Sequence, residues 1–349
     1  MGWKEFLVVP AAADRREALD LAERVRRPIG ASLGKDRKVT IKTPFTELLG
    51  CRHPMQQAGM GGLASSDLAV AVARAGGLGM LSGAGGARAL AAQLDTVPAG
   101  LAVGVNFLVP FLDRPAVEDA AARSPYVEFF WGSPDAGLVA SVHEGGALAG
   151  WQVGSTEEAA AAADAGCDLI VAQGIEAGGH VRGTVGLMAL VEEVRESVEL
   201  PLVAAGGIGS GRAMAAALVA GADAVRIGTR FIAATECGAH HDYVDALIRS
   251  GADDTVLTTA FGLGWPDAPH RVLKSAVAAG QARGEAQSWS PDWPSTDTVG
   301  PIEAKALYAG QSVGSVRSRQ AAAAIVEEIV LEAEAVLSRT REWRQGRGH

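Results

Sequence analysis

The segment Gln173–His180 carries the residue types best suited to moving a proton at carbon. It ends in Gly178, Gly179 and His180. Glycines leave the backbone bare, so a planar ligand can approach it closely, and an imidazole that is neutral near pH 7 can accept a proton from carbon. We therefore take His180 as the candidate catalytic base. The alternative is a histidine that only hydrogen-bonds its own loop.

The other histidines are weaker candidates for chemistry. His240, His241 and Asp242 resemble a metal-ligand cluster, but adjacent side chains on a helix point in different directions, and no further ligand is spaced to join them. We expect a solvated helix face there and no metal site. The remaining histidines are interpreted as structural or surface residues: His53, His143, His270 and His349.

Three common cofactor and nucleophile motifs are incomplete or missing. Residues 59–64 fit the dinucleotide pattern G-x-G-x-x-A, but the next apolar run ends at Ser82 and Gly83 without the acidic residue that would bind a ribose. The sequence also lacks the G-x-x-x-x-G-K-S/T phosphate loop of nucleotide triphosphatases. The pattern G-x-S-x-G occurs at 30–34 and 310–314, but neither match follows a predicted strand, as the elbow of serine hydrolases requires. A Rossmann site, a P-loop and serine acyl transfer therefore have no support.

The elements that must position His180 follow a βα rhythm. From Thr43 onward, short apolar runs alternate with Ala-rich helical segments. The predicted strands are 54–58, 78–81, 101–107, 127–131, 147–153, 169–173, 202–205 and 224–227. Such an alternation predicts an α/β fold with a parallel sheet, and closure into a (β/α)8 TIM barrel is the economical topology. An open doubly wound sheet is the alternative.

Two glycine-rich segments favour the barrel over the open sheet. Gly206–Gly209 follows the seventh predicted strand, and Gly228–Arg230 follows the eighth. Barrels often bind phosphate between the loops after these two strands, at helix N-termini and bare backbone amides. Gln173–His180 follows the sixth strand, which in a barrel places it on the same catalytic face.

The chain is expected to have three parts. Residues 1–42 are an N-terminal extension with a short charged amphipathic helix at 14–27, and residues 43–250 are the barrel. Residues 251–349 are expected to form a covering segment, irregular to 316, that ends in a helix at 317–339. Trp265, Trp289 and Trp293 lie in this segment, either lining a pocket or fastening it to the barrel; fastening is the preferred interpretation.

Composition and charge exclude several classes of protein. The 349 residues are 48% hydrophobic and 20% charged, with a net charge of −9, which suits a large core and disfavours nucleic acid as a partner. No apolar run is long enough to span a membrane and no secretory signal is recognisable, so we expect a cytoplasmic protein. Cys51, Cys167 and Cys237 have no C-x-x-C spacing and are expected to be buried thiols.

Several motifs, taken in order, resemble the nitronate monooxygenase family, formerly called 2-nitropropane dioxygenases. They are Pro54–Met60, Ala75–Gly79, Gly104–Phe107, Gln173–His180, Ala204–Ile208, Gly228–Phe231 and Ala309–Gln311. The resemblance runs from about Thr43 to Val316. It implies a TIM barrel that binds FMN, with a smaller segment over its mouth.

The resemblance also implies roles for individual residues. The FMN phosphate would be held by Gly206, Gly207, Gly228 and Thr229; the flavin or ribityl chain would contact Asn106, Gln173 and Gly178; and Met60 would lie beside the ring. Backbone amides at helix starts suit a phosphate, and glycine-lined walls suit a flat ring. The sequence departs from the usual family pattern at Gly59 (commonly Pro), at Arg226 (often Gln) and at Val181, which separates His180 from Arg182–Gly183.

The implied activity is oxidation of a nitronate or nitroalkane by O₂ on FMN. His180 would take the α-proton of a neutral nitro compound or hold the anionic nitronate. Two alternatives stay open: a flavin-dependent enoyl-acyl-carrier-protein reductase that uses NAD(P)H, and a flavin-binding protein without efficient turnover. The expected partners are therefore a small nitro compound and O₂, with no nucleic acid, no membrane and a possible oligomer.

Overall fold

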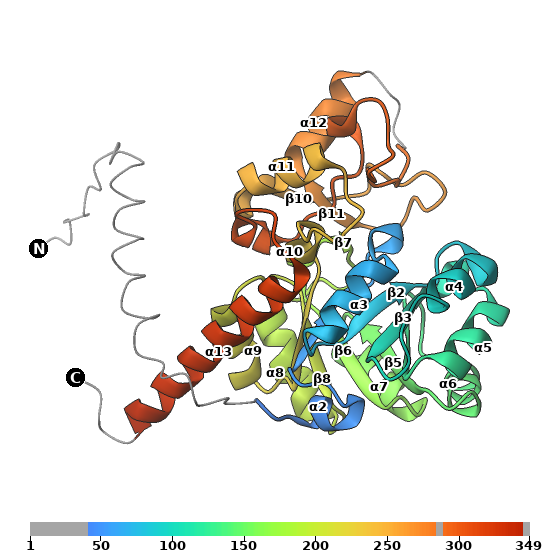
Figure 1. Cartoon of the computed structure of the whole chain (residues 1–349), viewed down its shortest axis with the longest axis vertical. Helices are drawn as coiled ribbons and strands as arrows, with labels where there is room; N and C mark the ends of the chain where they lie inside the picture. The colour runs from blue at the N-terminus through green and yellow to red at the C-terminus, as the bar shows by residue number, and fades with distance from the viewer. Residues whose placement is uncertain (1–40, 284–288, 345–349) are drawn as a thin grey trace, which may run out of the picture. The chain divides into compact units, whose positions relative to one another are not determined.

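The computed structural model describes residues 41–283 and 289–344, with the side chains of the last helix described as far as Arg339. Most of the expected N-terminal extension, including the helix at 14–27, lies outside the described residues. Figure 1 shows the described chain as a barrel, drawn in the lower part of the view, beneath a smaller group of elements around β10, β11, α11 and α12.

Eight parallel strands form one sheet in the order β1-β9-β8-β6-β5-β4-β3-β2. Their bounds are β1 Met55–Gln57, β2 Gly79–Ser82, β3 Val103–Leu108, β4 Tyr126–Phe130, β5 Leu148–Val153, β6 Leu169–Gln173, β8 Leu202–Ala205 and β9 Ala224–Ile227. The two edges meet where Gln57 N donates to Leu78 O at 2.9 Å and Leu78 N donates to Met55 O at 2.8 Å. The predicted TIM barrel is confirmed, and the open sheet is excluded.

Alternate residues of each strand face the barrel interior, because strand side chains alternate between the two faces. The lower interior is apolar and includes Met80, Val171 and Val203. Helix α2 (Pro44–Leu49) contributes Phe45 to the same cluster. Its N-terminus is capped by Thr43, whose hydroxyl accepts from Thr46 N, a contact typically worth about 1 kcal/mol. The next inward positions are polar, and they form the floor of the site.

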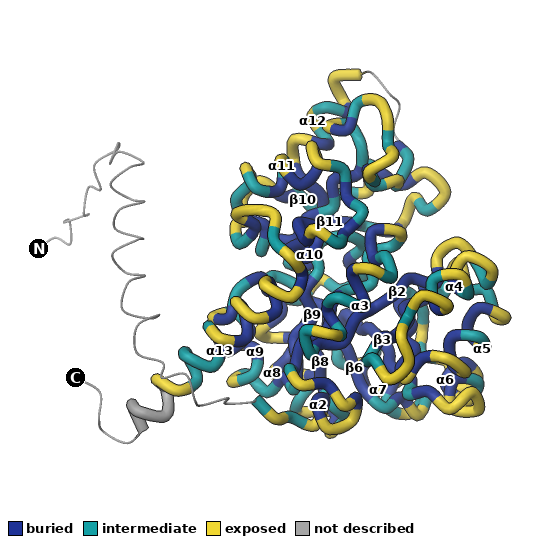
Figure 2. The backbone as a smooth tube through the Cα atoms, in the orientation of Figure 1, coloured by how far each residue is buried: buried dark blue, intermediate teal, exposed yellow. Residues whose placement is uncertain are grey.

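Helices cover the outside of the barrel. They are α3 Ser66–Arg74, α4 Gly86–Leu94, α5 Arg114–Arg123, α6 Ala136–Glu144, α7 Thr156–Asp164, α8 Leu187–Ser197 and α9 Gly211–Val219. The side chains of Ser65, Asp135, Ser155 and Ser210 accept hydrogen bonds from amides in the first turns of α3, α6, α7 and α9. In Figure 2 the strands are buried and the exposed residues gather at the outer turns.

The C-terminal helix has a different role from the one expected. Helix α13 (Ala322–Arg344) packs against both α9 and α3, which places it in the eighth helix position of the barrel instead of in the covering segment. Gly211 allows the close contact with α9, because a Cβ there would lie 2.4 Å from Ile329 O. Glu332 Oε2 also accepts from Gly211 N at 2.8 Å. The barrel is therefore completed only after the chain has built the segment above it.

Residues 238–283 and 289–315 are here called the cap. It contains α11 (His241–Arg249), in residues that were expected to belong to the barrel. It also contains β10 (Thr255–Thr258), β11 (His270–Leu273) and α12 (Lys274–Ala282), where an irregular segment was expected. Strand β11 pairs with β10 and with β7 (Gly179–His180), both antiparallel. The pairing with β7 was not predicted, because such short strands show no alternation and their partner lies in a distant loop. It brings the cap to the loop that carries His180.

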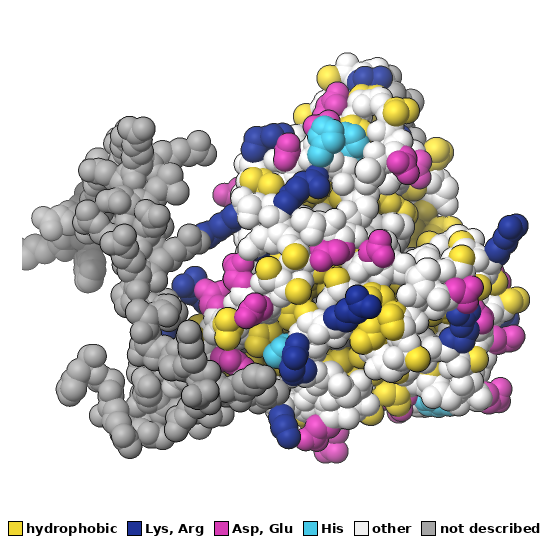
Figure 3. Space-filling model, viewed as in Figure 1, with side chains coloured by type: hydrophobic (Ala, Val, Ile, Leu, Met, Phe, Trp, Pro, Cys, Tyr) yellow, Lys and Arg dark blue, Asp and Glu magenta, His cyan; other side chains and the backbone are white. Residues whose placement is uncertain are grey.

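The surface carries charges of both signs, and the three cysteines are buried. Acidic and basic side chains are interspersed over the face drawn in Figure 3. Among the described residues, no helix combines the length and apolar character that a membrane span requires. The three cysteines are buried and unpaired, and burial raises the pKa of Cys51 and Cys167 to about 12, so both stay protonated.

Candidate active site

A cavity of about 450 Å³ lies at the carboxyl ends of the barrel strands, beneath the cap. Residues from barrel loops and from the cap both line it. All the residues expected to act as the base or to contact the flavin lie on its wall: Met60, Asn106, Gln173, Gly178, His180, Gly206, Gly207, Gly228 and Thr229. The position of the cavity is the one where TIM barrels carry out catalysis.

Part of the cavity wall is backbone without side chains. Gly206 and Gly207 have φ angles of +111° and +65°, a region that side chains rarely adopt. Among the described residues, the amides of Gly207 and Gly228 have no hydrogen-bond acceptor. Thr229 begins the short helix α10 (Thr229–Ile232), and its hydroxyl accepts from Gly310 N at 3.0 Å. Unpaired amides at a helix start are suited to an anion such as phosphate.

Gln173 and Gly178 contribute in different ways. Gln173 Nε2 donates to the carbonyl of His180 at 3.0 Å, while its Oε1 is buried without a hydrogen-bond partner. A buried unpaired acceptor is costly, so it favours a ligand that donates to it. At Gly178 a Cβ would lie 2.4 Å from Gly310 N. The lack of a side chain there lets the cap segment Ala309–Gln311 pack tightly against the loop.

His180 lies in β7, half-buried in the cavity wall. Burial, followed by the neighbouring His270, lowers its pKa from 6.5 to about 3. The imidazole is therefore neutral at physiological pH, as a proton acceptor must be. Four aromatic rings approach it, from Trp131, Trp265, His270 and Tyr308, with centroids 4.5 to 5.9 Å away.

His270 supports His180 from the adjacent strand. The sequence indicated a structural residue, and both of its ring nitrogens are engaged in the cap. Nε2 accepts from Phe261 N at 3.2 Å, and Nδ1 lies 3.0 Å from Ala268 O. This pattern fixes the tautomer with the proton on Nδ1. The strand register that pairs His270 with His180 was not visible in the sequence.

The floor of the cavity is a buried charged network that sequence analysis missed. Glu128 is fully buried and forms an ion pair with Arg226, which is 5% exposed and lines the cavity. Glu128 also accepts from Asn106 at 2.7 Å, from Tyr126 at 3.0 Å and from Gln56 at 3.2 Å. Arg226 donates to Gln152 and Gln56 as well. The signal was present: one acidic and one basic residue each lie in the middle of a strand expected to be buried.

Two tryptophans of the cap line the cavity, and a third packs within the cap. Trp265 and Trp293 line the cavity. Trp289 packs instead on Phe261, with ring centroids 5.0 Å apart, and fills the space above Gly280. Trp293 also covers Gly61, where a Cβ would lie 2.5 Å from the indole. The G-x-G-x-x-A pattern at residues 59–64 therefore includes a glycine against which Trp293 of the cap packs.

Several other polar residues of the motifs have structural roles. Both carboxylate oxygens of Glu176 accept from Leu187 N at 3.0 Å, which caps α8. His143 is paired with Asp168 at 2.8 Å on the surface. The carbonyl of Glu176 accepts from Gln311 N at 2.9 Å, and that of Ile175 accepts from Arg271 Nη2 at 2.8 Å. These last two bonds fasten the cap to the loop before His180.

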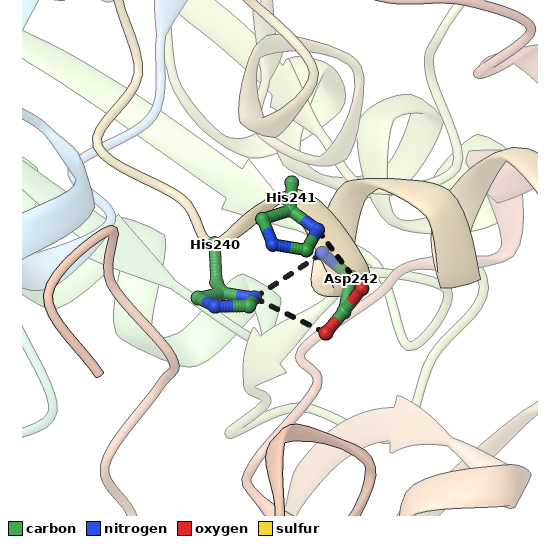
Figure 4. Close-up of side chains that lie close together, drawn as sticks. All are labelled: His240, His241 and Asp242. Atoms are coloured by element: carbon green, nitrogen blue, oxygen red, sulfur yellow. Dashed lines mark hydrogen bonds and ion pairs between the residues drawn. The ribbon is translucent and has the colours of Figure 1, made fainter. Parts of the chain in front are cut away.

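The cluster His240, His241 and Asp242 lies at the start of α11 (Figure 4). Its possible ligand atoms lie within 4.8 Å of one another, which is closer than expected for neighbours on a helix. His240 is the N-cap residue, so it lies outside the helical turn, and its Nδ1 accepts from Asp242 N at 3.2 Å. His241 Nδ1 lies 2.9 Å from Asp242 Oδ1, whereas His240 Nδ1, which caps the helix, lies 3.7 Å from Asp242 Oδ2.

Comparisons with a family model and with known proteins identify the same family. Residues 42–122 and 99–332 match the family model described as nitronate monooxygenase. A probable nitronate monooxygenase of Staphylococcus saprophyticus is 28% identical over 362 residues, covering 86% of this chain and 99% of the relative. A (3aS,4S,5R,7aS)-5-hydroxy-7a-methyl-1-oxo-octahydro-1H-indene-4-carboxyl-CoA dehydrogenase of Mycobacterium tuberculosis is 36% identical over 244 residues, covering 68% of this chain and 67% of the relative.

Solved structures agree with the fold. FabK from Thermotoga maritima superposes with a TM-score of 0.75 at 30% identity, covering 87% of this chain and all of that chain. Nitroalkane oxidase from Streptomyces ansochromogenes gives a TM-score of 0.67 at 29% identity, covering 85% and 99% of the two chains. The barrel and its cap are therefore shared with these proteins.

Proposed function

Because the chain belongs to the nitronate monooxygenase family and is a flavin-dependent oxidoreductase, we propose that it binds FMN and oxidises nitronates and nitroalkanes with O₂, with His180 as the base. The observation that carries the proposal is the position of His180. Its neutral imidazole lies on the wall of a cavity that is also lined by Gly207 and Gly228, whose backbone amides have no acceptor in the described chain.

The residues around the cavity fit FMN. Gly206, Gly207, Gly228 and Thr229 would hold the phosphate, because their bare backbone leaves room and two of their amides lack acceptors. The orphaned Oε1 of Gln173 suits a ring N–H donor. Asn106, Gly178 and Met60 would border the flavin and its ribityl chain. Bound FMN would supply the electron transfer and the reaction with O₂, which no side chain can provide.

His180 would take the α-proton of a neutral nitroalkane on a ring nitrogen. Its lowered pKa makes it a weak base in the empty cavity. The nitronate formed by that transfer is an anion, and an adjacent anion stabilises the imidazolium, which raises the pKa of His180 during the reaction. A preformed nitronate needs no such transfer. The apolar rings on the cavity wall, among them Trp265 and Trp293, would keep water away from the reacting carbon.

A second candidate is oxidation or reduction beside the carbonyl of an acyl thioester. The Mycobacterium tuberculosis relative is named a carboxyl-CoA dehydrogenase. The cavity wall includes Phe111 and Leu263, which are both exposed, and Trp265; this apolar set suits a bulky hydrocarbon acyl group. The enoyl-acyl-carrier-protein reductase considered from the sequence belongs to the same substrate class.

Oxygen uptake by the FMN-loaded protein tests the proposal. We expect O₂ consumption with a small nitronate, together with formation of the carbonyl product and without any need for NADH. Oxygen uptake that requires NADH, or turnover of an acyl-CoA with no response to nitronates, would replace the first candidate by the second.

A further inference from the structure

The imidazole of His180 is held without hydrogen bonds from side chains. Among the described residues, no carboxylate or carbonyl bonds to its ring, and its ring nitrogens are not among the buried atoms that lack partners, so they remain accessible from the cavity. Catalytic bases are usually oriented by a third group that hydrogen-bonds to the base. Another interaction must therefore fix the ring plane of His180.

Trp265 is the ring best placed to do so. Its centroid lies 4.5 Å from that of His180 with an interplanar angle of 30°, which is close to a stacked arrangement. His270 and Tyr308 approach at 5.4 and 5.9 Å with larger angles, and their polar atoms are engaged elsewhere. Neither is a charged group, so stacking is the dominant constraint on the imidazole.

Trp265 is itself braced on two sides. The ring of Trp131 meets it edge-on at 4.7 Å and also meets His180 edge-on at 5.9 Å. Phe111 meets Trp265 edge-on at 5.1 Å from the loop after β3. Trp265 follows Gly264, whose φ of +82° provides the turn in the loop between β10 and β11. The indole is thus confined between barrel and cap.

Trp131 adopts an unusual backbone conformation at this point. It is the one non-glycine residue with positive φ in the described chain, at +66°. A bulky side chain in the left-handed region is strained, and such strain persists where the surrounding structure enforces it, often at functional sites. In this conformation the indole makes edge-to-face contacts with both His180 and Trp265.

We propose that Trp265, braced by Trp131, is the positioning residue for His180, and that stacking takes the place of the usual orienting carboxylate. The identity of the reaction that His180 catalyses rests on the proposed function, whereas the packing of Trp265 on His180 does not. Because Trp265 comes from the cap and His180 from a barrel loop, His180 is correctly oriented only when the cap packs against the barrel. The loss of activity on replacing Trp265 should therefore depend on the presence of His180.

The test is a double-mutant cycle on FMN-loaded protein. Trp265→Leu should lower kcat/KM for a nitroalkane about tenfold or more, mainly in kcat, whereas Trp265→Phe, which keeps a stacking ring, should recover most of it. In a His180→Asn background, Trp265→Leu should cost no more than about twofold further. An undiminished loss in that background would overturn the proposal.

A second readout does not depend on the reaction. Nitrogen-15 spectra of the histidine rings should show His180 untitrated down to pH 5 in the parent and in Trp265→Phe, but titrating closer to pH 6.5 in Trp265→Leu, because water then reaches the ring. Trp289→Leu, which alters the cap away from His180, is the control and should leave this titration unchanged. If nitroalkane turnover is absent in the parent, the proposed function fails, and the titration alone decides the positioning role. An unchanged titration in Trp265→Leu would contradict that role.

Discussion

The ion pair beneath the cavity offers a sharp test of the barrel interior. Glu128 is fully buried, and it accepts hydrogen bonds from Asn106, Tyr126 and Gln56 in addition to its pairing with Arg226. Burial, strengthened by Glu128, raises the pKa of Tyr126 well above its usual value, so its hydroxyl remains a donor. The substitution Glu128→Gln keeps the shape of the side chain but removes its charge and turns an amide N–H₂ toward these donors.

Glu128→Gln should destabilise the protein because it leaves the charge of Arg226 buried without a partner charge. Without the carboxylate, the guanidinium of Arg226 is uncompensated at 5% exposure, and breaking such a pair typically costs about 3–5 kcal/mol. The converse change, Arg226→Gln, should cost less, because Glu128 keeps three neutral donors. The double variant should be more stable than Glu128→Gln alone, since it leaves neither charge buried and the two effects are coupled.

Urea unfolding of the FMN-free proteins measures these differences, followed by the same series with saturating FMN to separate ligand stabilisation. With a slope of roughly 3 kcal/mol per molar urea, the midpoint for Glu128→Gln should fall by about 1–1.7 M. The reasoning is refuted if Glu128→Gln lies within about 1 kcal/mol of the parent, or if the double variant is the least stable of the three.

Three further predictions concern the site. Gly207→Leu should lose bound FMN, because φ is +65° there and a side chain would meet Glu176 Cβ at 3.2 Å; full flavin content by absorbance would remove Gly207 from the phosphate cradle. His180→Asn, with FMN content verified, should lose ~10²- to 10⁴-fold with a nitroalkane and far less with its nitronate; equal losses would assign His180 to binding. The folded protein should lose stability from pH 6.5 downward, because unfolded His180 takes a proton near 6.5 and the folded form only near 3, a difference of about 1–2 kcal/mol at pH 5; a urea midpoint with the same pH dependence in His180→Asn would contradict the buried neutral imidazole.

The barrel was predictable because each of its strands can be recognised from the local sequence. The strands at 169–173, 202–205 and 224–227 have the predicted bounds, since continuous apolar runs are characteristic of strands buried on both faces. The placement of His180, Gly206, Gly207 and Gly228 on one cavity wall followed from the rule that barrels carry their sites at the strand carboxyl ends.

The cap and the floor of the site required tertiary information. Strands β7, β10 and β11 have two to four residues each, and β7 exists only because β11 pairs with it. Glu128 and Arg226 lie in strands that are not neighbours in the sheet, so their pairing depends on closure of the barrel. The role of α13 as the eighth outer helix likewise depends on the chain returning from the cap.

Anaerobic mixing of the FMN-loaded protein with a small nitronate, and separately with NADH, tests the central claim most directly. The absorbance of bound oxidised flavin near 450 nm follows the transfer of electrons from each compound. The account predicts that the nitronate bleaches this band within the turnover time and that NADH does not. Rapid bleaching by NADH with no response to the nitronate would contradict it.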